Sequence, residues 1–250
     1  RAAERKKTGL FLAEGFNAVS EAAQSRLVRE LFFTADALER HHDLIASVEA
    51  GGARVHPITD RAAKALSDTV TPQGLIAVTE LVDVPIDRAL AGTPRLVAVP
   101  VEMAEPGNAG TVIRVADAAG ADSVVLLGDS VDPHNGKCVR ASAGSVFHLP
   151  IVRERSIESG IDALRRAGLT IVATAADGEV DLDDADELLT QPTAWLFGNE
   201  AHGLPESVTR DADHRIRIPI HGRAESLNLA TAAAICLYAS ARAQRRSETP

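Results

Sequence analysis

The sequence predicts an α/β protein with a smaller N-terminal unit and a larger C-terminal unit. Residues 1–80 contain four short apolar runs separated by helical periodicity, and residues 95–250 contain six more with helical segments between them. The stretch between them, residues 81–94, holds two prolines and a glycine and has the composition of a linker. Apolar strands that alternate with helices form mostly parallel sheets covered on both faces, and this is the fold class that we expect for the C-terminal unit.

The N-terminal unit, residues 1–80, is expected to contain four strands and three helices. The strands are expected at LFLAEG, VRELFFT, ARVHPI and GLIAVTE, and the helices at about residues 15–25, 35–50 and 59–67. Asp36 and Asp60 stand near the starts of the second and third helices. We expect them to cap these helices, because a side-chain oxygen there accepts free amide protons. Gly51 and Gly52 mark the end of the second helix.

The C-terminal unit, residues 95–250, is expected to contain six strands at RLVAVPV, SVVLLG, VFHLPIV, LTIVATA, TAWLFG and HRIRIPI. The last strand is expected to end at Pro219, because proline has no amide proton for a further ladder bond. A glycine turn at Gly222 follows. A helix is then expected to begin at about Leu227, with Ser226 as its N-cap.

Composition excludes several classes of protein. No apolar run approaches the roughly 20 residues that span a bilayer, and the first residues are too polar for a signal peptide. The two cysteines, Cys138 and Cys236, have no CxxC or Cys/His spacing, so we expect neither a disulfide scaffold nor a structural zinc site. These features predict a cytoplasmic protein. The net charge of -9 permits a nucleic-acid partner only through local groups of basic residues.

Three polar, glycine-bearing loops follow strands of the C-terminal unit. The first contains Asn108 and leads to Arg114, the second contains Glu200, and the third contains Ser226 and Asn228. Taken singly, each loop has the composition of a capped turn. In open α/β sheets ligands bind at the carboxyl ends of the strands, so the three loops together predict one shared pocket.

These loops carry a resemblance to a known family. NAGTVIR, WLFGNEAHGLP and IPIHGRAESLNLATAAA resemble, in order, the three motifs of the SpoU (TrmH) branch of the SPOUT RNA methyltransferases. The likeness covers about residues 95–245, and VDPHNGKCVRASAGSVFHLPIV resembles the region between the first two motifs. The first 80 residues are similar, through LFLAEGFNAVSEA, to the ribosomal-protein-like substrate-binding domain of rRNA members such as thiostrepton-resistance methyltransferases.

The resemblance implies a trefoil-knotted α/β domain that binds S-adenosylmethionine, forms a homodimer through the C-terminal domain and methylates a ribose 2′-hydroxyl in RNA. It favours 23S rRNA as the substrate, with tRNA as the alternative. The residues at the positions of the family's catalytic cluster are Asn108, Arg114, Glu200 and Ser226. Those at its cofactor-lining positions are Gly198, Ile218, Leu227 and Asn228, with Leu196 and Phe197 as further apolar walls. The chain departs from the family's pattern at Glu105, where aspartate is commoner, and at Ala201, where glycine is frequent.

The chemistry implied by the resemblance requires no metal. The sulfonium of S-adenosylmethionine is already an activated leaving group, so the protein has chiefly to hold the methyl group in line with the hydroxyl oxygen. Arg114 has two possible roles, as an unusual general base or as a charged stabiliser of the oxyanion, and its high pKa favours the second.

Two other function classes stay open from the sequence. One is a non-catalytic RNA-binding protein on a degenerate methyltransferase scaffold, against which the three intact motifs argue. The other is a nucleotide-dependent α/β enzyme such as a dehydrogenase. That class is disfavoured because the chain has no GxGxxG after the first strand of the C-terminal unit and no GKS or GKT phosphate loop.

Overall fold

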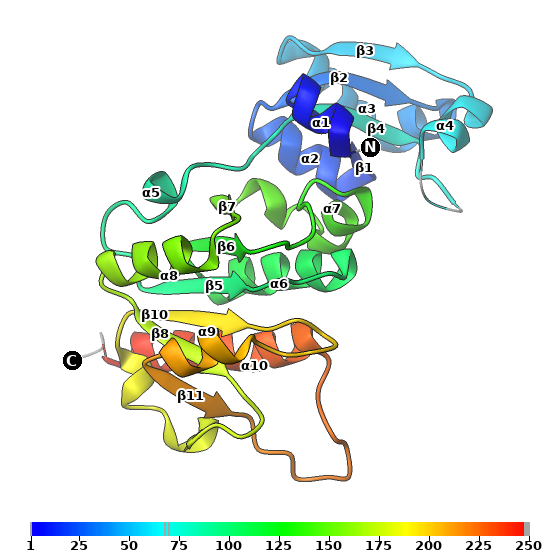
Figure 1. Cartoon of the computed structure of the whole chain (residues 1–250). Helices are drawn as coiled ribbons and strands as arrows, with labels where there is room; N and C mark the ends of the chain where they lie inside the picture. The colour runs from blue at the N-terminus through cyan, green and yellow to red at the C-terminus, as the bar shows by residue number, and fades with distance from the viewer. Residues whose placement is uncertain (1, 68, 70, 248–250) are drawn as a thin grey trace. The chain divides into compact units, whose positions relative to one another are not determined.

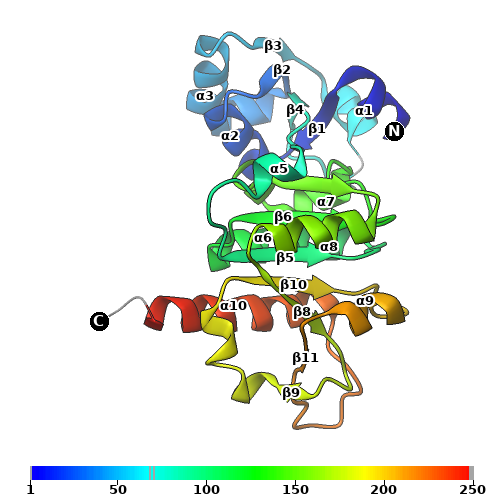
Figure 2. The same cartoon turned by 60° about the vertical axis from the view of Figure 1, so that its left-hand side comes forward.

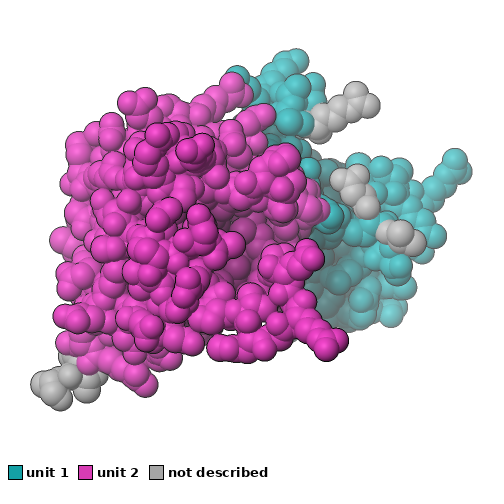
Figure 3. All heavy atoms as spheres, turned by 60° about the horizontal axis from the view of Figure 1, so that its bottom comes forward, with its two compact units in different colours: residues 1–82, 132–148 teal, residues 83–131, 149–250 magenta. Residues whose placement is uncertain are grey.

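The structure is a computed structural model that describes residues 2–67, 69 and 71–247 (Figure 1). The chain forms two compact units (Figure 3). Unit 1 contains the residues up to Val82 together with Asp132–His148, and unit 2 contains Asp83–Val131 and the residues from Leu149 onward. None of the helices within the described ranges is both long and apolar enough to cross a lipid bilayer.

Unit 1 contains a four-stranded sheet of order β1-β4-β2-β3, in which β2 and β3 are parallel and the other pairs are antiparallel. Its elements are α1 (Ala2–Thr8), β1 (Leu10–Glu14), α2 (Phe16–Gln24), β2 (Val28–Phe33), α3 (Ala35–Ala50), β3 (Arg54–Pro57), α4 (Asp60–Leu66), β4 (Leu75–Glu80), α7 (Gly136–Ser142) and the 3-10 helix η1 (Ser145–Phe147). The four expected strands and three expected helices are confirmed. Helix α1 was not expected, because its polar sequence has no apolar face and none of its described residues is buried.

The expected caps of α3 and α4 were wrong by one or two residues. Thr34 Oγ1 accepts from Ala37 N at 3.3 Å, and Thr59 caps α4 in the same way. Both threonines have the extended backbone of an N-cap, whereas Asp36 and Asp60 already lie in the first helical turn. A carboxylate there favours the helix through the helix dipole rather than by capping it. Gly51 is the C-cap of α3, as expected.

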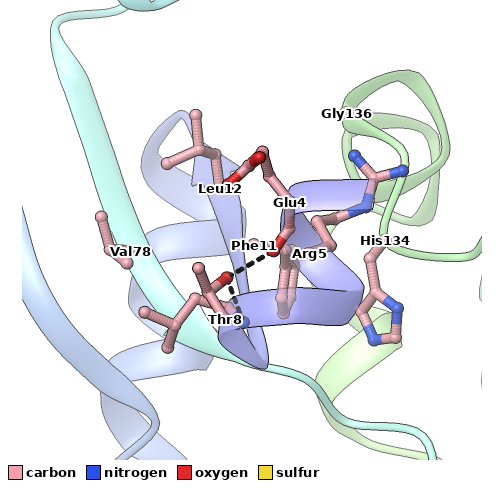
Figure 4. A pocket seen from close by; sticks show the side chains of 9 residues that line it. Glu4, Arg5, Thr8, Phe11, Leu12, Val78, His134 and Gly136 are labelled. Atoms are coloured by element: carbon pink, nitrogen blue, oxygen red, sulfur yellow. Dashed lines mark hydrogen bonds between the residues drawn. The ribbon is translucent and has the colours of Figure 1, made fainter. Parts of the chain in front are cut away.

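Asp132–His148 packs within unit 1, although the sequence-based division places it in the C-terminal domain. The Asp132 carboxylate accepts from Arg5 Nη2 at 2.7 Å and lies 3.1 Å from His134 Nδ1. Because His134 Nε2 accepts from Val82 N at 3.1 Å, the imidazole proton lies on Nδ1 and is donated to Asp132. Figure 4 shows Arg5, Phe11 and His134 around a cavity of about 290 Å³. The histidine ring packs on Phe11, with 4.8 Å between ring centroids.

Replacing Asp132 with asparagine is expected to lower the free energy of unfolding by about 2–3 kcal/mol near neutral pH, because Arg5 and His134 lose a largely buried partner. Burial alone would raise the pKa of Asp132, but the hydrogen bonds from His134 and Arg5 outweigh burial and hold that pKa well below its usual range. A carboxylate with a lowered folded-state pKa stabilises the fold above its unfolded-state pKa of about 3.9, and this contribution is lost as the pH falls toward the folded-state value.

Denaturant unfolding should therefore show a constant difference between parent and Asp132→Asn from about pH 7 to pH 5, which narrows below about pH 4. Asp162→Asn, which changes an exposed carboxylate, is the control and should show little difference at any pH. If the difference in the free energy of unfolding between parent and Asp132→Asn did not change with pH, the lowered pKa of Asp132 would be contradicted.

Unit 2 contains a seven-stranded sheet of order β7-β6-β5-β10-β8-β11-β9 in which every pair is parallel. Its elements are α5 (Ile86–Ala89), β5 (Leu96–Pro100), α6 (Pro106–Ala119), β6 (Ser123–Leu127), β7 (Ile151–Glu154), α8 (Ile157–Arg166), β8 (Thr170–Thr174), β9 (Val180–Asp181), η2 (Leu182–Asp184), η3 (Leu188–Thr190), β10 (Thr193–Phe197), α9 (Glu206–Asp211), β11 (His214–Arg217) and α10 (Leu229–Ser247). The expected parallel sheet is confirmed. The short strand β9 is additional, and the run VFHLPIV divides into η1 and β7.

Helices cover both faces of this sheet. Helices α8 and α9 lie over one face, and α6 and α10 lie over the other (Figures 1 and 2). On the first face Val97, Val99 and Leu196 pack with Ile161 and Leu164 of α8. On the second face Trp195 donates a hydrogen bond from Nε1 to Ser240 of α10 at 2.8 Å. The trefoil knot implied by the resemblance stays a prediction.

The stretch expected to be a linker, residues 81–94, is part of the folded unit 2 from Asp83 onward. Ile86–Ala89 form helix α5, and Ala89 and Leu90 are buried in the core of unit 2. The spacing of Ile86, Ala89 and Leu90 places their side chains on one side of a helical turn, which explains why this stretch packs instead of remaining an open connection. The assignment of residues 1–80 and 95–250 as separate functional domains stays a prediction.

Candidate functional site

The three motif loops leave the same edge of the unit 2 sheet. Strands β5 and β10 are neighbours, and β8 lies between β10 and β11. Because all these strands are parallel, the loops that follow β5, β10 and β11 emerge at the carboxyl edge, which is where ligands bind in open α/β sheets. The loop after β11 leads into α10, which packs beside α6 on one face of the sheet.

A chain of hydrogen bonds joins one side chain from each loop. Asn108 Nδ2 donates to Glu200 Oε1 at 3.1 Å, and Asn228 Nδ2 donates to Asn108 Oδ1 at 3.1 Å. The orientation of the Asn108 amide follows from its partners, because a carboxylate only accepts hydrogen bonds. We call Glu200, Asn108 and Asn228 the polar triad. It confirms that the three loops converge, as the sequence predicted.

Glu200 also connects the loop after β10 to the loop after β5 through hydrogen bonds. Its carboxylate accepts from the backbone amides of Ala104 at 3.4 Å and Glu105 at 3.3 Å. Asn199 adds a second connection, because its Nδ2 donates to the carbonyl oxygen of Glu102 at 2.7 Å. Asn199 was not among the expected site residues, although its place between Gly198 and Glu200 marked it as part of the loop.

Glu105 positions Asn108 by capping helix α6. Its carboxylate accepts from the amide of Gly107 and from that of Asn108 at 3.0 Å. Pro106 occupies the first position of the helix, where no amide donor is needed. A glutamate at this position therefore forms the N-cap that the commoner aspartate of the family would offer, and the sequence departure at Glu105 leaves the loop well defined.

Gly198 is needed by the turn of its own loop. A Cβ added to Gly198 would lie 2.2 Å from the carbonyl carbon of Gly203 and 2.3 Å from Leu204 N. The two ends of the turn are held together by hydrogen bonds of 2.9 and 2.8 Å between the backbones of Asn199 and Gly203. The resemblance places Gly198 among the cofactor-lining positions, which stays a prediction, and the atoms that crowd it in the structure belong to its own loop.

The start of α10 differs from the prediction. Strand β11 ends at Arg217, and α10 begins at Leu229. The N-cap is Asn228, whose Oδ1 accepts from Ala230 N at 2.9 Å and Thr231 N at 3.2 Å, and not Ser226. An asparagine oxygen reaches the amides two and three residues ahead, so Asn228 both begins the helix and donates to Asn108.

Arg114 and Ser226 are not part of the polar triad. Both side chains are exposed, and neither forms a hydrogen bond or ion pair with any residue that the structure describes. Arg114 lies six residues after Asn108 on α6, which places the two side chains about 120° apart around the helix at roughly 100° per residue. The structure therefore brings together two of the four predicted catalytic residues, Asn108 and Glu200.

The predicted cofactor-lining residues fall into two groups. Leu196 and Phe197 are fully buried, Leu196 in the core and Phe197 stacked on Trp195, so their side chains do not line an open surface. Ile218 and Leu227 are half-buried and flank an irregular segment. Within the described chain, residues 218–227 form no backbone hydrogen bond.

This arrangement fits an adenosine-bearing cofactor. Backbone N–H and C=O groups of residues 218–227 have no hydrogen-bond partner in the part of the chain that the structure describes and can bond the polar edges of adenine and ribose. The apolar side chains of Ile218 and Leu227 can pack against a ring face. Among the described residues, no group of three or more His, Cys, Asp or Glu side chains is arranged to hold a metal ion.

Comparisons with known families and with known proteins both relate this chain to rRNA methylases. The SpoU rRNA Methylase family matches residues 95–238, and the MRM3-like substrate binding domain matches residues 1–77. The 23S rRNA (guanosine(2553)-2′-O)-methyltransferase RlmP of Bacillus subtilis is 35% identical over 236 residues, which cover 94% of this chain and 90% of that protein.

Solved structures agree with the sequence comparisons. The AdoMet-bound rRNA methyltransferase from Sinorhizobium meliloti aligns with a TM-score of 0.85 and 32% identity, covering 100% of this chain and 92% of that one. The SpoU methyltransferase AviRb from Streptomyces viridochromogenes, in complex with AdoMet, also aligns with a TM-score of 0.85 and 32% identity, covering 99% and 95%. With the three motif loops joined at the carboxyl edge of a parallel sheet, the chain belongs to the SpoU rRNA methylase family.

Proposed function

We propose that this protein is an S-adenosylmethionine-dependent methyltransferase that methylates a ribose 2′-hydroxyl in 23S rRNA. The observation that carries the proposal is the polar triad, which ties the three motif loops into one site. The substrate class is supported by relatives named as 23S rRNA 2′-O-methyltransferases, and the cofactor by related structures that contain AdoMet. We place the protein in the cytoplasm, as its composition predicts.

Bound S-adenosylmethionine supplies an electrophilic methyl group. Ile218 and Leu227 would pack against its apolar surfaces, and backbone groups of residues 218–227 would form hydrogen bonds with its polar edges. Gly198 acts by permitting the turn that keeps Asn199 and Glu200 bonded to the loop after β5. Asn228 fixes the end of the third loop against Asn108.

The ribose 2′-oxygen would attack the methyl carbon as the bond between that carbon and sulfur breaks, so that S-adenosylhomocysteine leaves and the hydroxyl proton passes to solvent. The Glu200 carboxylate already accepts hydrogen bonds from Asn108 and from two backbone amides, so we assign it to positioning the loops. Arg114 has an exposed guanidinium, which stabilises the charge that develops on the oxygen. Ser226 has an exposed hydroxyl that orients the substrate hydroxyl.

Methyl transfer from radiolabelled S-adenosylmethionine to unmodified 23S rRNA and tRNA transcripts tests the proposal. We expect label in 23S rRNA, with the modified nucleotide resistant to alkaline cleavage on its 3′ side because its 2′-oxygen is methylated. Asn108→Ala, which breaks the polar triad, should lose most of this activity. Label in tRNA alone would support the alternative substrate. Methylation of a base, or no binding of S-adenosylmethionine by calorimetry, would overturn the proposal.

We also infer a homodimer through unit 2. Helices α6 and α10 pack together, and α10 exposes the large side chains of Ile235 and Tyr238. The Tyr238 hydroxyl donates to the carbonyl oxygen of Ala118 on α6 at 3.3 Å. Arg114 lies one turn before Ala118 on the same exposed side, so a second copy on this surface lies close to the catalytic arginine.

Tyr238→Glu is expected to convert the dimer to a monomer, because it places a charge within an apolar contact. Sedimentation velocity of the parent and the variant measures this change. Leu66→Glu, which alters an exposed apolar residue of unit 1, is the control and should leave the dimer intact. A parent protein that sediments as a monomer at every concentration would contradict the inference.

A further inference from the structure

A cavity of about 620 Å³ opens between α2 and α3 of unit 1, within the range of volumes that hold small ligands. Phe16, Ser20 and Gln24 line it from α2, and Arg40, His41 and Asp43 are among the residues that line it from α3. None of the predicted site residues of unit 2 belongs to it. The cavity is formed entirely by residues of the segment that matches the MRM3-like substrate binding domain.

A stacked ring pair stands in this cavity. The rings of Phe16 and His41 lie 4.7 Å apart with an interplanar angle of 28°. Phe16 is 41% exposed, although the helix that it begins has three buried residues. The pair therefore presents an open aromatic face on which a further planar ring can continue the stack.

Gln73 forms hydrogen bonds beside each of the two rings. The backbone amide of Phe16 donates to Gln73 Oε1 at 3.0 Å. His41 lies where the backbone of α3 leaves the helical conformation, at φ -135° and ψ 32°. Arg40, the preceding residue, is anchored to the carbonyl oxygens of Asp36 and Gln73 at 3.2 Å each.

The charges of the cavity suit a base better than a phosphate. Its lining holds the carboxylates of Glu39 and Asp43, which accept hydrogen bonds from the amino groups of nucleobases and repel a phosphate group. The guanidinium of Arg40 also lines the cavity, but it already donates to two backbone carbonyl oxygens. Gln24 and Ser20 add neutral donors and acceptors. An aromatic face with polar groups around its edge is the arrangement with which proteins hold an unstacked base.

We propose that this cavity binds one unpaired nucleobase of the RNA substrate, stacked on the Phe16–His41 pair. The inference rests on the proposed function, because it takes the ligand to be the RNA that unit 2 methylates. The cavity contributes recognition of an extruded base, and Arg40 holds the rim of the cavity in shape. Phosphate contacts elsewhere contribute the salt-dependent part of RNA affinity.

The test compares Phe16→Leu with a matched change at a second ring pair of unit 1. Phe32 stacks on His56 with 5.0 Å between centroids on the sheet, outside this cavity, so Phe32→Leu removes the same kind of ring contact. Binding of full-length protein to an unmodified 23S rRNA transcript is measured by filter retention at several salt concentrations. We expect Phe16→Leu to raise Kd about tenfold, which is within the effect of losing one base–aromatic stack.

A stacking contact also predicts how Kd depends on salt concentration and on the side chain at position 16. The slope of log Kd against log salt concentration should be the same for Phe16→Leu and the parent, because no phosphate contact is lost. Phe16→Tyr should retain the parent's affinity, since it keeps the ring. With a 4-thiouridine-substituted transcript, photocrosslinks should map to residues 16–24 or 39–47.

Three outcomes separate the inference from the proposed function. If the parent binds and methylates 23S rRNA but Phe16→Leu and Phe32→Leu have equal Kd values, the cavity is not a base site and the proposed function stands. A smaller salt slope for Phe16→Leu would also overturn the base assignment, because it indicates a lost phosphate contact. If the parent neither binds nor methylates 23S rRNA, the proposed function itself has failed.

Discussion

Gly198→Ala is expected to lower the affinity for S-adenosylmethionine at least tenfold and the rate of methyl transfer by about 100-fold or more. The added Cβ would lie 2.2 Å from backbone atoms of Gly203, so the turn of residues 198–204 has to open. Overpacking of this kind costs about 1–3 kcal/mol, and a displacement of reacting groups by about 1 Å costs roughly 100-fold in rate. The movement also withdraws Glu200 from Asn108.

Gly222→Ala is the matched control for this substitution. Gly222 lies in the third motif loop, and no described heavy atom lies within 4 Å of a Cβ added there. Neither glycine has a positive φ, so the two changes differ in available space and not in backbone strain. Calorimetric titration with S-adenosylmethionine and single-turnover assays measure both variants. An affinity of Gly198→Ala equal to that of the parent would show that the turn does not shape the cofactor site.

Arg114→Ala is expected to reduce single-turnover methyl transfer by about 100- to 1,000-fold, the usual effect of removing one donor from a developing oxyanion. Arg114→Lys should retain more activity than Arg114→Ala, because lysine keeps the positive charge and loses only the planar fork. Affinity for S-adenosylmethionine should stay unchanged in both, since Arg114 is exposed and forms no contact with the polar triad. Arg166→Ala, which changes an exposed arginine of α8, is the control.

The pH profile of Arg114→Lys distinguishes the two roles of Arg114. If the residue acts as a general base, the lower pKa of lysine moves the rising limb of the rate profile to lower pH. If it acts as a charged stabiliser, the limb stays in place. The measurement uses saturating RNA so that binding does not limit the rate. If both Arg114 variants kept nearly the activity of the parent, Arg114 would be neither a general base nor a charged stabiliser.

Strand positions were predictable because apolar runs at strand length are a local signal. The runs at Leu10–Glu14 and Thr193–Phe197 each became a strand, and the loops that follow parallel strands necessarily meet at one edge. The convergence of the Asn108 and Glu200 loops was predictable for the same reason. Their individual hydrogen bonds were not, because strand order and the geometry of each turn depend on contacts between distant segments.

The errors at helix ends have a common cause. At Thr34 and Asn228 two or more polar residues near the helix start were chemically able to cap, and the sequence does not reveal which of them has the extended backbone of an N-cap. The burial of Phe197 could not be read from the sequence, because an apolar residue at a strand end can face the core or a ligand. The place of Asp132–His148 depends on contacts with Arg5 and Phe11, more than 120 residues earlier in the chain.

The packing of Asp132–His148 within unit 1 has a consequence for biosynthesis. When only the first 82 residues have emerged from the ribosome, Asp132 and His134 are not yet available. Arg5 then lacks its ion-pair partner Asp132, and Phe11 lacks its ring partner His134. Unit 1 is therefore completed only after part of unit 2 has emerged, and the polypeptide passes between the units three times, after Val82, Val131 and His148. A protease that cuts between residues 81 and 94 leaves two of these passages intact, and neither product of such a cut is a free-standing unit.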